Sequence, residues 1–325
     1  MKTAFITGIA GQDGSYLTEY LLKKNYRVTG IVRRNSVAEH QTDRIKGISN
    51  VDIRYGDLLD EGSLQSALIE FNPDEIYNLA AQSHVRISND IPQFTVATNA
   101  NGTLNLLESY RRFSPNARFY QASSSEMFGN SVDSDGFQRE TTPMHPVSPY
   151  GCAKLFSYNI SKHYREAHNL FITNGILFNH ESPRRGSNFV TNKVVKTAVQ
   201  IKLGVSKTLE LGNLDSYRDW GHSYDYVRAM HRIITAEKPN DYVVATGQTH
   251  SVRQLCEFVF ARLDMNYENY VVQNSKFIRP QELKYLKGDS SRVRDELGWK
   301  PTYTFETLLE EMIEHWVRLI SRDLA

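Results

Sequence analysis

The first half of the chain alternates short apolar runs with longer amphipathic stretches. Apolar runs of strand length occupy residues 4–7, 27–32, 51–55, 75–80, 118–122 and 171–177. Apolar residues recur at helical spacing across residues 15–24, 64–70, 95–112 and 149–168. Strands separated by helices of this length predict right-handed crossovers, and therefore a doubly wound parallel sheet of the α/β class.

The pattern changes after about residue 180. Loops rich in Arg and Asn and short strands follow, with two late helices predicted at 252–263 and 305–320. No internal repeat, low-complexity stretch or flexible linker separates the two parts. We therefore predict a first domain at residues 1–178, to which a later strand and helix return, and a smaller interleaved lobe at residues 179–325.

Composition narrows the class of protein. Of the 325 residues, 40% are hydrophobic and 23% charged, which is ordinary for a globular protein, and a net charge of +1 gives no reason to expect nucleic acid or an anionic membrane as partner. The two cysteines suit a reducing compartment. Residues 1–6 run directly into a strand, which leaves no room for a signal peptide, and no apolar run approaches the ~20 residues needed to span a bilayer. We expect a cytoplasmic protein without a metal site.

A glycine-rich loop follows the first predicted strand and opens the first helix. Its sequence is Gly8-Ile9-Ala10-Gly11-Gln12-Asp13-Gly14. Glycines let backbone amides approach a pyrophosphate, and the start of a helix supplies partial positive charge. Because strand, loop and helix occur in the required order, we predict a dinucleotide site of the Rossmann type, in the G-x-x-G-x-x-G variant of short-chain dehydrogenases/reductases.

The end of the second strand indicates which dinucleotide binds. Arg33 and Arg34 stand where an enzyme that uses NAD usually has an acid for the ribose 2′-hydroxyl. A guanidinium would bind a 2′-phosphate, so we predict NADP; a solvated basic turn is the alternative. Asp57 follows the third strand and is a candidate acceptor for the adenine amine. Leu79-Ala80-Ala81-Gln82-Ser83 ends the fourth strand with small residues that suit close approach of the cofactor.

Four residues form the candidate catalytic group. Tyr150 and Lys154 are spaced i, i+4, so they share one helix face, where the ammonium would favour the ionised phenol. Ser124, at the end of a strand, would complete a proton-transfer trio for oxidising a hydroxyl. Such a trio needs no carboxylate, so Glu126, two residues further on, indicates a second acid/base step. Taken alone, the Tyr–Lys spacing is common, and ordinary surface residues are the competing interpretation.

Several longer segments resemble the GDP-mannose 4,6-dehydratases, which are extended short-chain dehydrogenases/reductases. These segments are residues 7–17 (TGIAGQDGSYL), 177–186 (LFNHESPRRG), 211–215 (LGNLD), 218–222 (RDWGH) and 245–252 (ATGQTHSV). The resemblance extends from residue 3 to the Leu-Gly-Trp-Lys-Pro segment at 297–301.

The resemblance implies roles for individual residues. Ser124, Glu126, Tyr150 and Lys154 would be catalytic. Contacts to NADP would come from Gly8 to Gly14, Arg33, Arg34, Asp57, Leu58, Leu79 to Ser83, Phe94, Lys154, His180 and Arg185. The GDP-sugar would be held by Ser83, Asn179, Lys193, Arg218, Arg279 and Glu282. The cations among these suit a diphosphate, and Glu282 suits the N1 and 2-amino donors of guanine.

Three departures from the family pattern are evident. Ser124 replaces the family's threonine, which keeps the hydroxyl. The loop at 34–43, which in the family reaches a neighbouring subunit, is shortened, so a homo-oligomer is expected but dimer and tetramer both stay open. The segment at 279–286 (RPQELKYL) differs from the usual Arg-Pro-Ala-Glu-Val-Asp, which leaves GDP-manno-heptose open as an alternative sugar.

The predicted reaction is a dehydration with a recycling cofactor. Tyr150 would take the proton of the 4-hydroxyl while hydride moves from C4 to NADP, Glu126 would remove the C5 proton, and hydride would return to C6 as water leaves. A 4-reductase or epimerase needs the Tyr–Lys pair but no Glu126. A non-catalytic NADP-binding sensor would be expected to lack one of the catalytic residues, and all are present.

Overall fold

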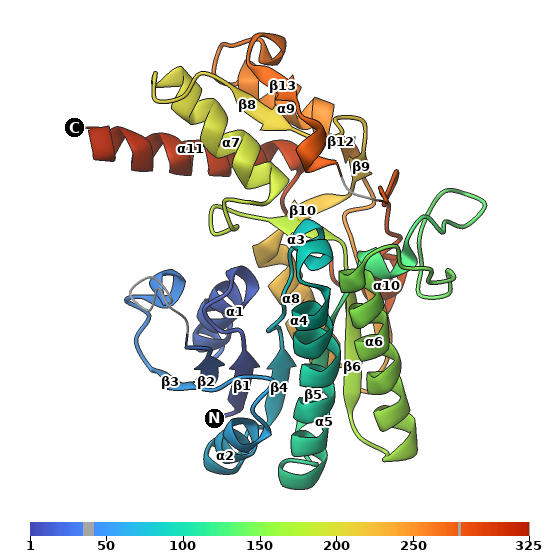
Figure 1. The fold of residues 1–325 in the computed structure, drawn as a ribbon. Helices are drawn as coiled ribbons and strands as arrows, with labels where there is room; N and C mark the ends of the chain where they lie inside the picture. Colours follow the sequence, from blue (N-terminus) through green and yellow to red (C-terminus); the bar gives the residue numbers. More distant parts are fainter. Residues whose placement is uncertain (35–41, 279–280, 325) are drawn as a thin grey trace.

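The computed structural model describes residues 1–34, 42–278 and 281–324. Its centre is a parallel seven-stranded sheet in the order β11-β6-β5-β4-β1-β2-β3 (Figure 1). The strands are β1 Thr3–Thr7, β2 Arg27–Val32, β3 Val51–Tyr55, β4 Glu75–Asn78, β5 Arg118–Ser124, β6 Ile172–Leu177 and β11 Asp241–Val244. The strand order reverses between β1 and β4, which opens a crevice at their carboxyl ends. The predicted doubly wound sheet is confirmed.

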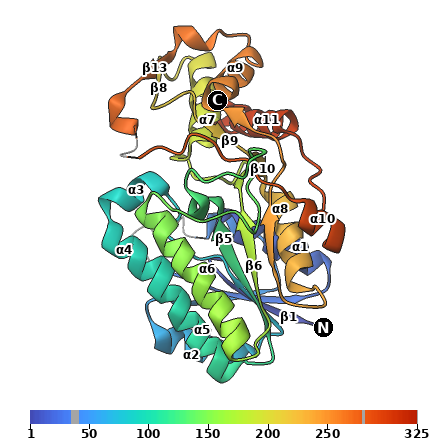
Figure 2. The same cartoon turned by 90° about the vertical axis from the view of Figure 1, so that its right-hand side faces the viewer.

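Helices cover both faces of the sheet, as Figure 2 shows. One face carries α1 Gln12–Lys23, α8 Ser223–Ile234 and α10 Ser291–Leu297. The other carries α2 Glu61–Phe71, α5 Gly102–Phe113 and α6 Pro149–Ala167. Each face has its own apolar core, with Leu17 and Met230 on the first and Leu68 and Leu107 on the second. Both faces of the central strands are therefore buried, which explains their near-continuous apolar sequence.

A second lobe lies beyond the carboxyl ends of the strands (Figure 1). Its helices are α7 Val190–Lys202, α9 Val252–Ala261 and α11 Phe305–Leu324. Its strands form three pairs: β7 Asn179–Glu181 with β10 Trp220–His222, β9 Tyr217–Arg218 with β12 His250–Ser251, and β8 Leu209–Leu211 with β13 Val271–Gln273. A separate core around Leu255, Leu309 and Trp220 holds this lobe together.

The chain crosses between the lobes more than once. After β7 and α7 it returns through α8 and β11, leaves again for α9, returns through α10 and ends in α11. Strand β11 pairs with β6 at the edge of the central sheet. Within the described ranges, no helix has the length and apolar character needed to cross a membrane.

One element prediction was incomplete and one was wrong. The late helices predicted at 252–263 and 305–320 are present as α9 and α11, but the described part of residues 179–325 also contains α7, α8 and α10, which were not predicted. In α8 the apolar side chains at 226, 227, 230, 233 and 234 do follow helical spacing, but polar residues around them obscure it. The helix predicted at 95–112 is interrupted by a π-helical turn at Ala97–Asn101 between α4 Pro92–Val96 and α5. There the Asn99 side chain accepts from the backbone N–H of Gln82 (2.8 Å) and donates to its carbonyl (2.9 Å).

Candidate active site

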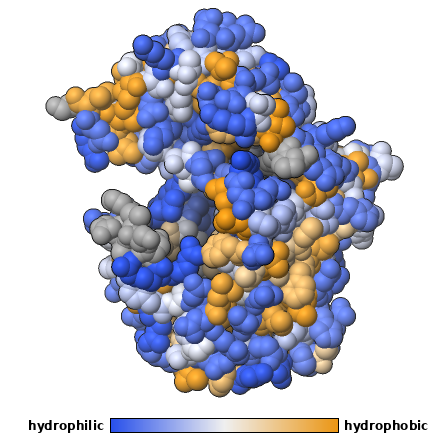
Figure 3. All heavy atoms as spheres, viewed as in Figure 1, coloured by the Kyte–Doolittle hydropathy of each residue, from blue (hydrophilic) through white to orange (hydrophobic). Residues whose placement is uncertain are grey.

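A cavity of about 730 Å³ lies at the carboxyl ends of the strands, between the two lobes. Figure 3 shows the hollow as a notch on the left of the molecule, bordered mainly by hydrophilic residues. Residues from the end of β5 and from the loops after β1 and β4 form its floor, and residues of the second lobe form its roof. This is the position at which doubly wound sheets bind ligands.

The glycine loop packs too closely for side chains. Gly8 has φ +71°, and a Cβ there would lie 2.9 Å from the Ala80 nitrogen. A Cβ on Gly14 would lie 2.3 Å from the Gly8 carbonyl oxygen. Gly11 is the N-cap of α1 and gives no side-chain cap, so the helix begins with bare backbone facing the cavity. This cradle fits the pyrophosphate of a dinucleotide.

Most of the predicted cofactor residues line this one cavity. They are Gly8, Ala10 to Gly14, Arg33, Asp57, Leu58, Leu79 to Ser83, Phe94, Lys154, His180 and Arg185. Ile9 is not among the lining residues, since its side chain is fully buried in the core beneath the loop. Arg34 is exposed and does not line the cavity either, whereas the Arg33 guanidinium lies 5.5 Å from the centre of the Phe94 ring.

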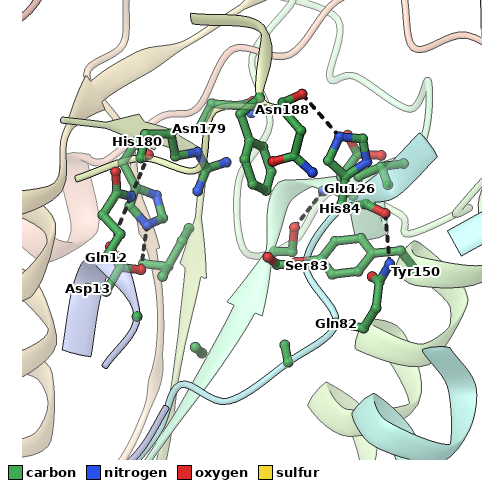
Figure 4. A pocket seen from close by; sticks show the side chains of 18 of the residues that line it. Gln12, Asp13, Gln82, Ser83, His84, Glu126, Tyr150, Asn179, His180 and Asn188 are labelled. Carbon is green, nitrogen blue, oxygen red and sulfur yellow. Dashed lines mark hydrogen bonds and ion pairs between the residues drawn. The ribbon is translucent and has the colours of Figure 1, made fainter. Parts of the chain in front are cut away.

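The four predicted catalytic residues lie together and are buried, with exposed fractions of 5–8%. Ser124 ends β5, and Glu126 follows in a short 3-10 helix, where its backbone N–H donates to Ser124 Oγ (3.3 Å). Tyr150 and Lys154 lie in the first turns of α6, with the Lys154 nitrogen 5.9 Å from the Tyr150 ring centre and donating to the Ala122 carbonyl (2.9 Å). Figure 4 shows Glu126 and Tyr150 at the same end of the pocket.

The electrostatics of the Tyr–Lys pair differ from the sequence-based expectation. Burial raises the pKa of Tyr150 to about 12; the Ser124 hydroxyl opposes the shift, and the charge of Glu126 adds to it. Burial also lowers the pKa of Lys154 to about 8, against the attraction of Asp13. The protein alone therefore keeps Tyr150 as a phenol at neutral pH, because desolvation outweighs the Ser124 hydrogen bond and the charge of Arg185.

Most of the predicted sugar-nucleotide residues line the same cavity. They are Ser83, Asn179, Lys193, Arg218 and Glu282. Lys193 Nζ donates to the Glu210 carbonyl (2.6 Å) and lies 3.7 Å from the centre of the Phe277 ring. Arg279 lies outside the described residues.

Two of these residues are placed by the segment around 283. Arg218 Nη1 donates to the Leu283 carbonyl (2.9 Å), and Asn130 Nδ2 donates to the Glu282 carbonyl (3.3 Å). Leu283 and Leu286 are fully buried in the core. Of the described residues in the divergent segment, Glu282 is the one that lines the cavity. The differing side chains at 281 and 283–286 therefore do not line the cavity.

Some residues that line the cavity were not predicted from the sequence. His84 reaches across the cavity, its Nε2 3.2 Å from the Asn188 carbonyl oxygen (Figure 4), and its ring lies 5.0 Å from that of Phe189. Phe277 comes from a short turn after β13. His84 directly follows the small-residue run at 79–83, and this position was the one feature of the sequence that indicated a place at the cavity. Nothing in the sequence near Phe277 or Asn188 indicated that these residues line it.

The fold and the site together define a class. A doubly wound parallel sheet, a glycine loop after its first strand, and Ser, Tyr and Lys gathered at the cavity are the features of the extended short-chain dehydrogenases/reductases. Within that class, the sequence model of the family described as "GDP-mannose 4,6 dehydratase" matches residues 5–312, and the chain belongs to this family.

Individual relatives agree with the family match. GDP-mannose 4,6 dehydratase of Drosophila melanogaster is 45% identical, the alignment covering 99% of this chain and 88% of that protein. GDP-mannose 4,6 dehydratase 1 of Arabidopsis thaliana is 46% identical over 99% of this chain and 91% of its own length. A crystal structure of dTDP-glucose 4,6-dehydratase from Bacillus anthracis, in complex with NAD, superposes with a TM-score of 0.85 over the whole of both chains at 22% identity. At that identity, the last comparison supports the fold alone.

Proposed function

We propose that this protein removes water from GDP-mannose to give GDP-4-keto-6-deoxymannose, with NADP as a cofactor that is reduced and reoxidised in each cycle. The observation that carries the proposal is the burial of Glu126 beside Tyr150 and Lys154 in one cavity. A reductase or epimerase of this fold has no use for that carboxylate. Full-length relatives with this activity in their names support the same conclusion.

The protein's own residues divide the work. The glycine loop and Arg33 would hold NADP, which would supply the hydride acceptor for oxidation at C4 and the hydride donor for reduction at C6. Tyr150 takes the proton of the 4-hydroxyl as a phenolate, after its own phenolic proton has been lost to solvent. Ionising a phenol with a pKa of about 12 at pH 7 costs about 7 kcal/mol. We therefore expect Tyr150 to ionise only when the positive charge of the oxidised nicotinamide lies in the site. Lys154 anchors this end through Ala122 and supplies a nearby ammonium.

Glu126 carries the second half of the reaction. Once C4 is a ketone, the proton on C5 is acidic, and Glu126 removes it as hydroxyl leaves C6 as water. Its backbone N–H bond to Ser124 ties the base to the same strand end that holds the oxidation group. One short segment, residues 124–126, therefore serves both proton transfers.

We assign the two lobes to the two ligands. Residues 1–178, with the returning β11 and α8, would hold NADP, with Arg33 reaching its 2′-phosphate. Residues 179–325 would hold the GDP-sugar through Asn179, Lys193, Arg218 and Glu282. Asn179 Oδ1 supports this assignment, because it is buried at the cavity without a hydrogen-bond partner among the described residues. We propose mannose rather than manno-heptose, since the divergent segment brings no new described side chain to the cavity.

The direct test incubates the protein and NADP with GDP-mannose and follows the sugar by NMR. We expect the C6 hydroxymethyl signals to be replaced by a methyl doublet, with no net change in the nicotinamide absorbance. Substrate carrying deuterium at C4 should give product carrying deuterium at C6. Loss of that label to solvent would refute internal hydride return. Turnover of GDP-manno-heptose alone would keep the mechanism and change the substrate.

We further propose a homo-oligomer in the cytoplasm, a dimer or a tetramer. The free thiols of Cys152 and Cys256 support a reducing compartment. Exposed apolar side chains on α4 and α6, among them Val96 and Phe156, support a subunit interface there. The loop expected to reach a neighbouring subunit falls largely at 35–41, outside the described residues. Light scattering of the purified protein would measure the number of subunits.

A further inference from the structure

His180 carries a contact that a neutral imidazole cannot satisfy. Its Nδ1 lies 2.7 Å from the Phe178 carbonyl oxygen, and its Nε2 lies 2.8 Å from Asp13 Oδ2 (Figure 4). A carbonyl and a carboxylate both accept hydrogen bonds, so both ring nitrogens face acceptors. A neutral imidazole has a single N–H, whereas an imidazolium has two.

The carboxylate is held as an acceptor on both sides. Asp13 Oδ1 accepts from Ser223 Oγ (2.6 Å) and from Gln12 Nε2 (3.3 Å). Burial opposes ionisation of Asp13, but its attraction to His180 and the hydrogen bonds of His180 and Ser223 lower its pKa to about 2. Burial likewise disfavours a charged His180, and the charge of Asp13 and its hydrogen bond raise the pKa of the imidazole nevertheless. The two groups stabilise each other as an ion pair.

We propose that His180 is a half-buried imidazolium before cofactor binds, and that its ion pair with Asp13 is a positioning device for NADP. Asp13 stands in the glycine loop, at the start of α1, where the pyrophosphate would lie. A bare carboxylate there would repel the cofactor. The proton on His180 cancels that charge, and the pair joins α1 to β7 across the cavity. This inference rests on the proposed binding of NADP.

Charged, phenolic and hydroxyl groups from several elements surround the pair. The groups that face it are Arg185 after β7, Tyr226 and Ser223 of α8, Lys154 and Tyr150 of α6, and Tyr120 of β5. Tyr226 stacks on the imidazole at 4.4 Å between ring centres. The positive charge of Arg185 disfavours a charged His180, but Arg185 Nε lies 3.0 Å from Glu181 Oε2, and this ion pair offsets part of its effect. Asp13 is therefore the group that sets the protonation of His180.

Binding of NADP and protonation of His180 are thus linked. As pH rises through the pKa of His180, Asp13 loses its partner and the pyrophosphate meets an uncompensated negative charge. A charge this close to a titratable group shifts the pKa of that group by one unit or more. Because cofactor binding and protonation of His180 must affect each other equally, NADP should bind about tenfold more weakly once His180 is neutral. Below that pKa the affinity should be constant.

Nitrogen-15 NMR of the whole protein tests the charge state directly. With His180→Gln used to assign the signals, the wild type at pH 7 should show both His180 nitrogens protonated. Both protons should persist above the pH at which an ordinary histidine loses one. A single N–H at pH 7 would overturn the proposal.

Binding measurements test the positioning role. Titrating NADP at a series of pH values should show His180→Gln binding about tenfold more weakly than wild type at pH 7, and Asp13→Asn/His180→Gln recovering most of that loss. If the pair were only structural, the double variant should bind NADP no better than His180→Gln, because it has lost both partners of the native contact. Recovery of affinity therefore distinguishes the charge effect from a structural one. Ser223→Ala, which removes a hydrogen bond but no charge, is the matched control and should keep the wild-type pH dependence.

The outcomes separate this inference from the proposed function. If wild type binds NADP with the same affinity on both sides of the pKa found by NMR, or if the double variant binds no better than His180→Gln, the positioning device is refuted while the cofactor assignment stands. If wild type binds no NADP at any pH, the cofactor assignment itself fails, and this inference falls with it.

Discussion

Replacing Glu126 by Gln should separate the two halves of the proposed reaction. The amide keeps the shape of a side chain that is only 6% exposed, but it cannot remove the C5 proton. A general base contributes about 10²–10⁴ in rate, so dehydration should slow by that factor, equivalent to about 3–5 kcal/mol. Oxidation at C4 does not need the carboxylate.

The structure predicts that the first half is even favoured in this variant. The charge of Glu126 is one of the influences that raise the pKa of Tyr150 to about 12, so its removal lowers that pKa and makes the phenolate easier to form in the site. Substrate should therefore reduce the bound NADP as fast as in wild type, and the reduced cofactor should accumulate because elimination stalls.

The assay is stopped-flow absorbance of the nicotinamide, with product measured by NMR in the same samples. We expect a single-turnover rise in absorbance in Glu126→Gln and little 6-deoxy product. Glu140→Gln is the control, since Glu140 is a partly buried acid that accepts from the Val243 backbone N–H and does not line the cavity. If Glu126→Gln turned over at the wild-type rate, the carboxylate would be a bystander and the two-step reasoning would be wrong.

Three further changes test other parts of the site. Tyr150→Phe should abolish the absorbance rise and the product together, because proton removal from the 4-hydroxyl comes first; any reduced cofactor in that variant would contradict this role. Arg33→Ala should weaken NADP by about 1.5–3 kcal/mol and leave NAD unchanged, which parallel titrations of the two cofactors would measure. Lys154→Met should be inactive, yet its free energy of unfolding at pH 7 should be about 2 kcal/mol higher than that of wild type. Lowering the pKa of the lysine from 10.5 to about 8 destabilises the folded wild type by about 3 kcal/mol, and the hydrogen bond to Ala122 offsets about 1 kcal/mol of this. Since the folded chain gives up this proton near pH 8 and the unfolded chain near 10.5, wild-type stability should rise across that window, and the advantage of the variant in urea unfolding should shrink; a constant difference from pH 7 to 10 would refute the assignment.

The sequence was most informative where function depends on neighbours along the chain. The glycine loop, the strand end at Ser124 and the Tyr150–Lys154 pair are each set by a few consecutive residues, and the sheet then brings them to one edge. Their spacing therefore predicted both the fold and the centre of the site.

It was least informative where placement depends on distant packing. His84 meets Asn188 only because the loop after β7 folds back over α3 Val85–Asp90, whose N-terminus His84 caps through Nδ1. The π-helical turn at 97–101 exists because Asn99 bonds to the segment after β4. The phenolate expected for Tyr150 assumed that Lys154 decides its charge, whereas the depth of burial decides it, and spacing along a helix does not report depth.

The repeated crossing of the chain between the lobes constrains how this protein could be cut or recombined. A fragment ending near residue 178 would lack the edge strand β11 and the helix α8, leaving Tyr77, Tyr120 and Leu177 without the partners that now bury them. A fragment of the remaining residues would carry that strand and helix with no sheet to join. The lobe that we propose holds the sugar nucleotide therefore cannot be exchanged as a contiguous cassette, and we expect new substrate preference in such a chain to arise by single substitutions around an intact scaffold.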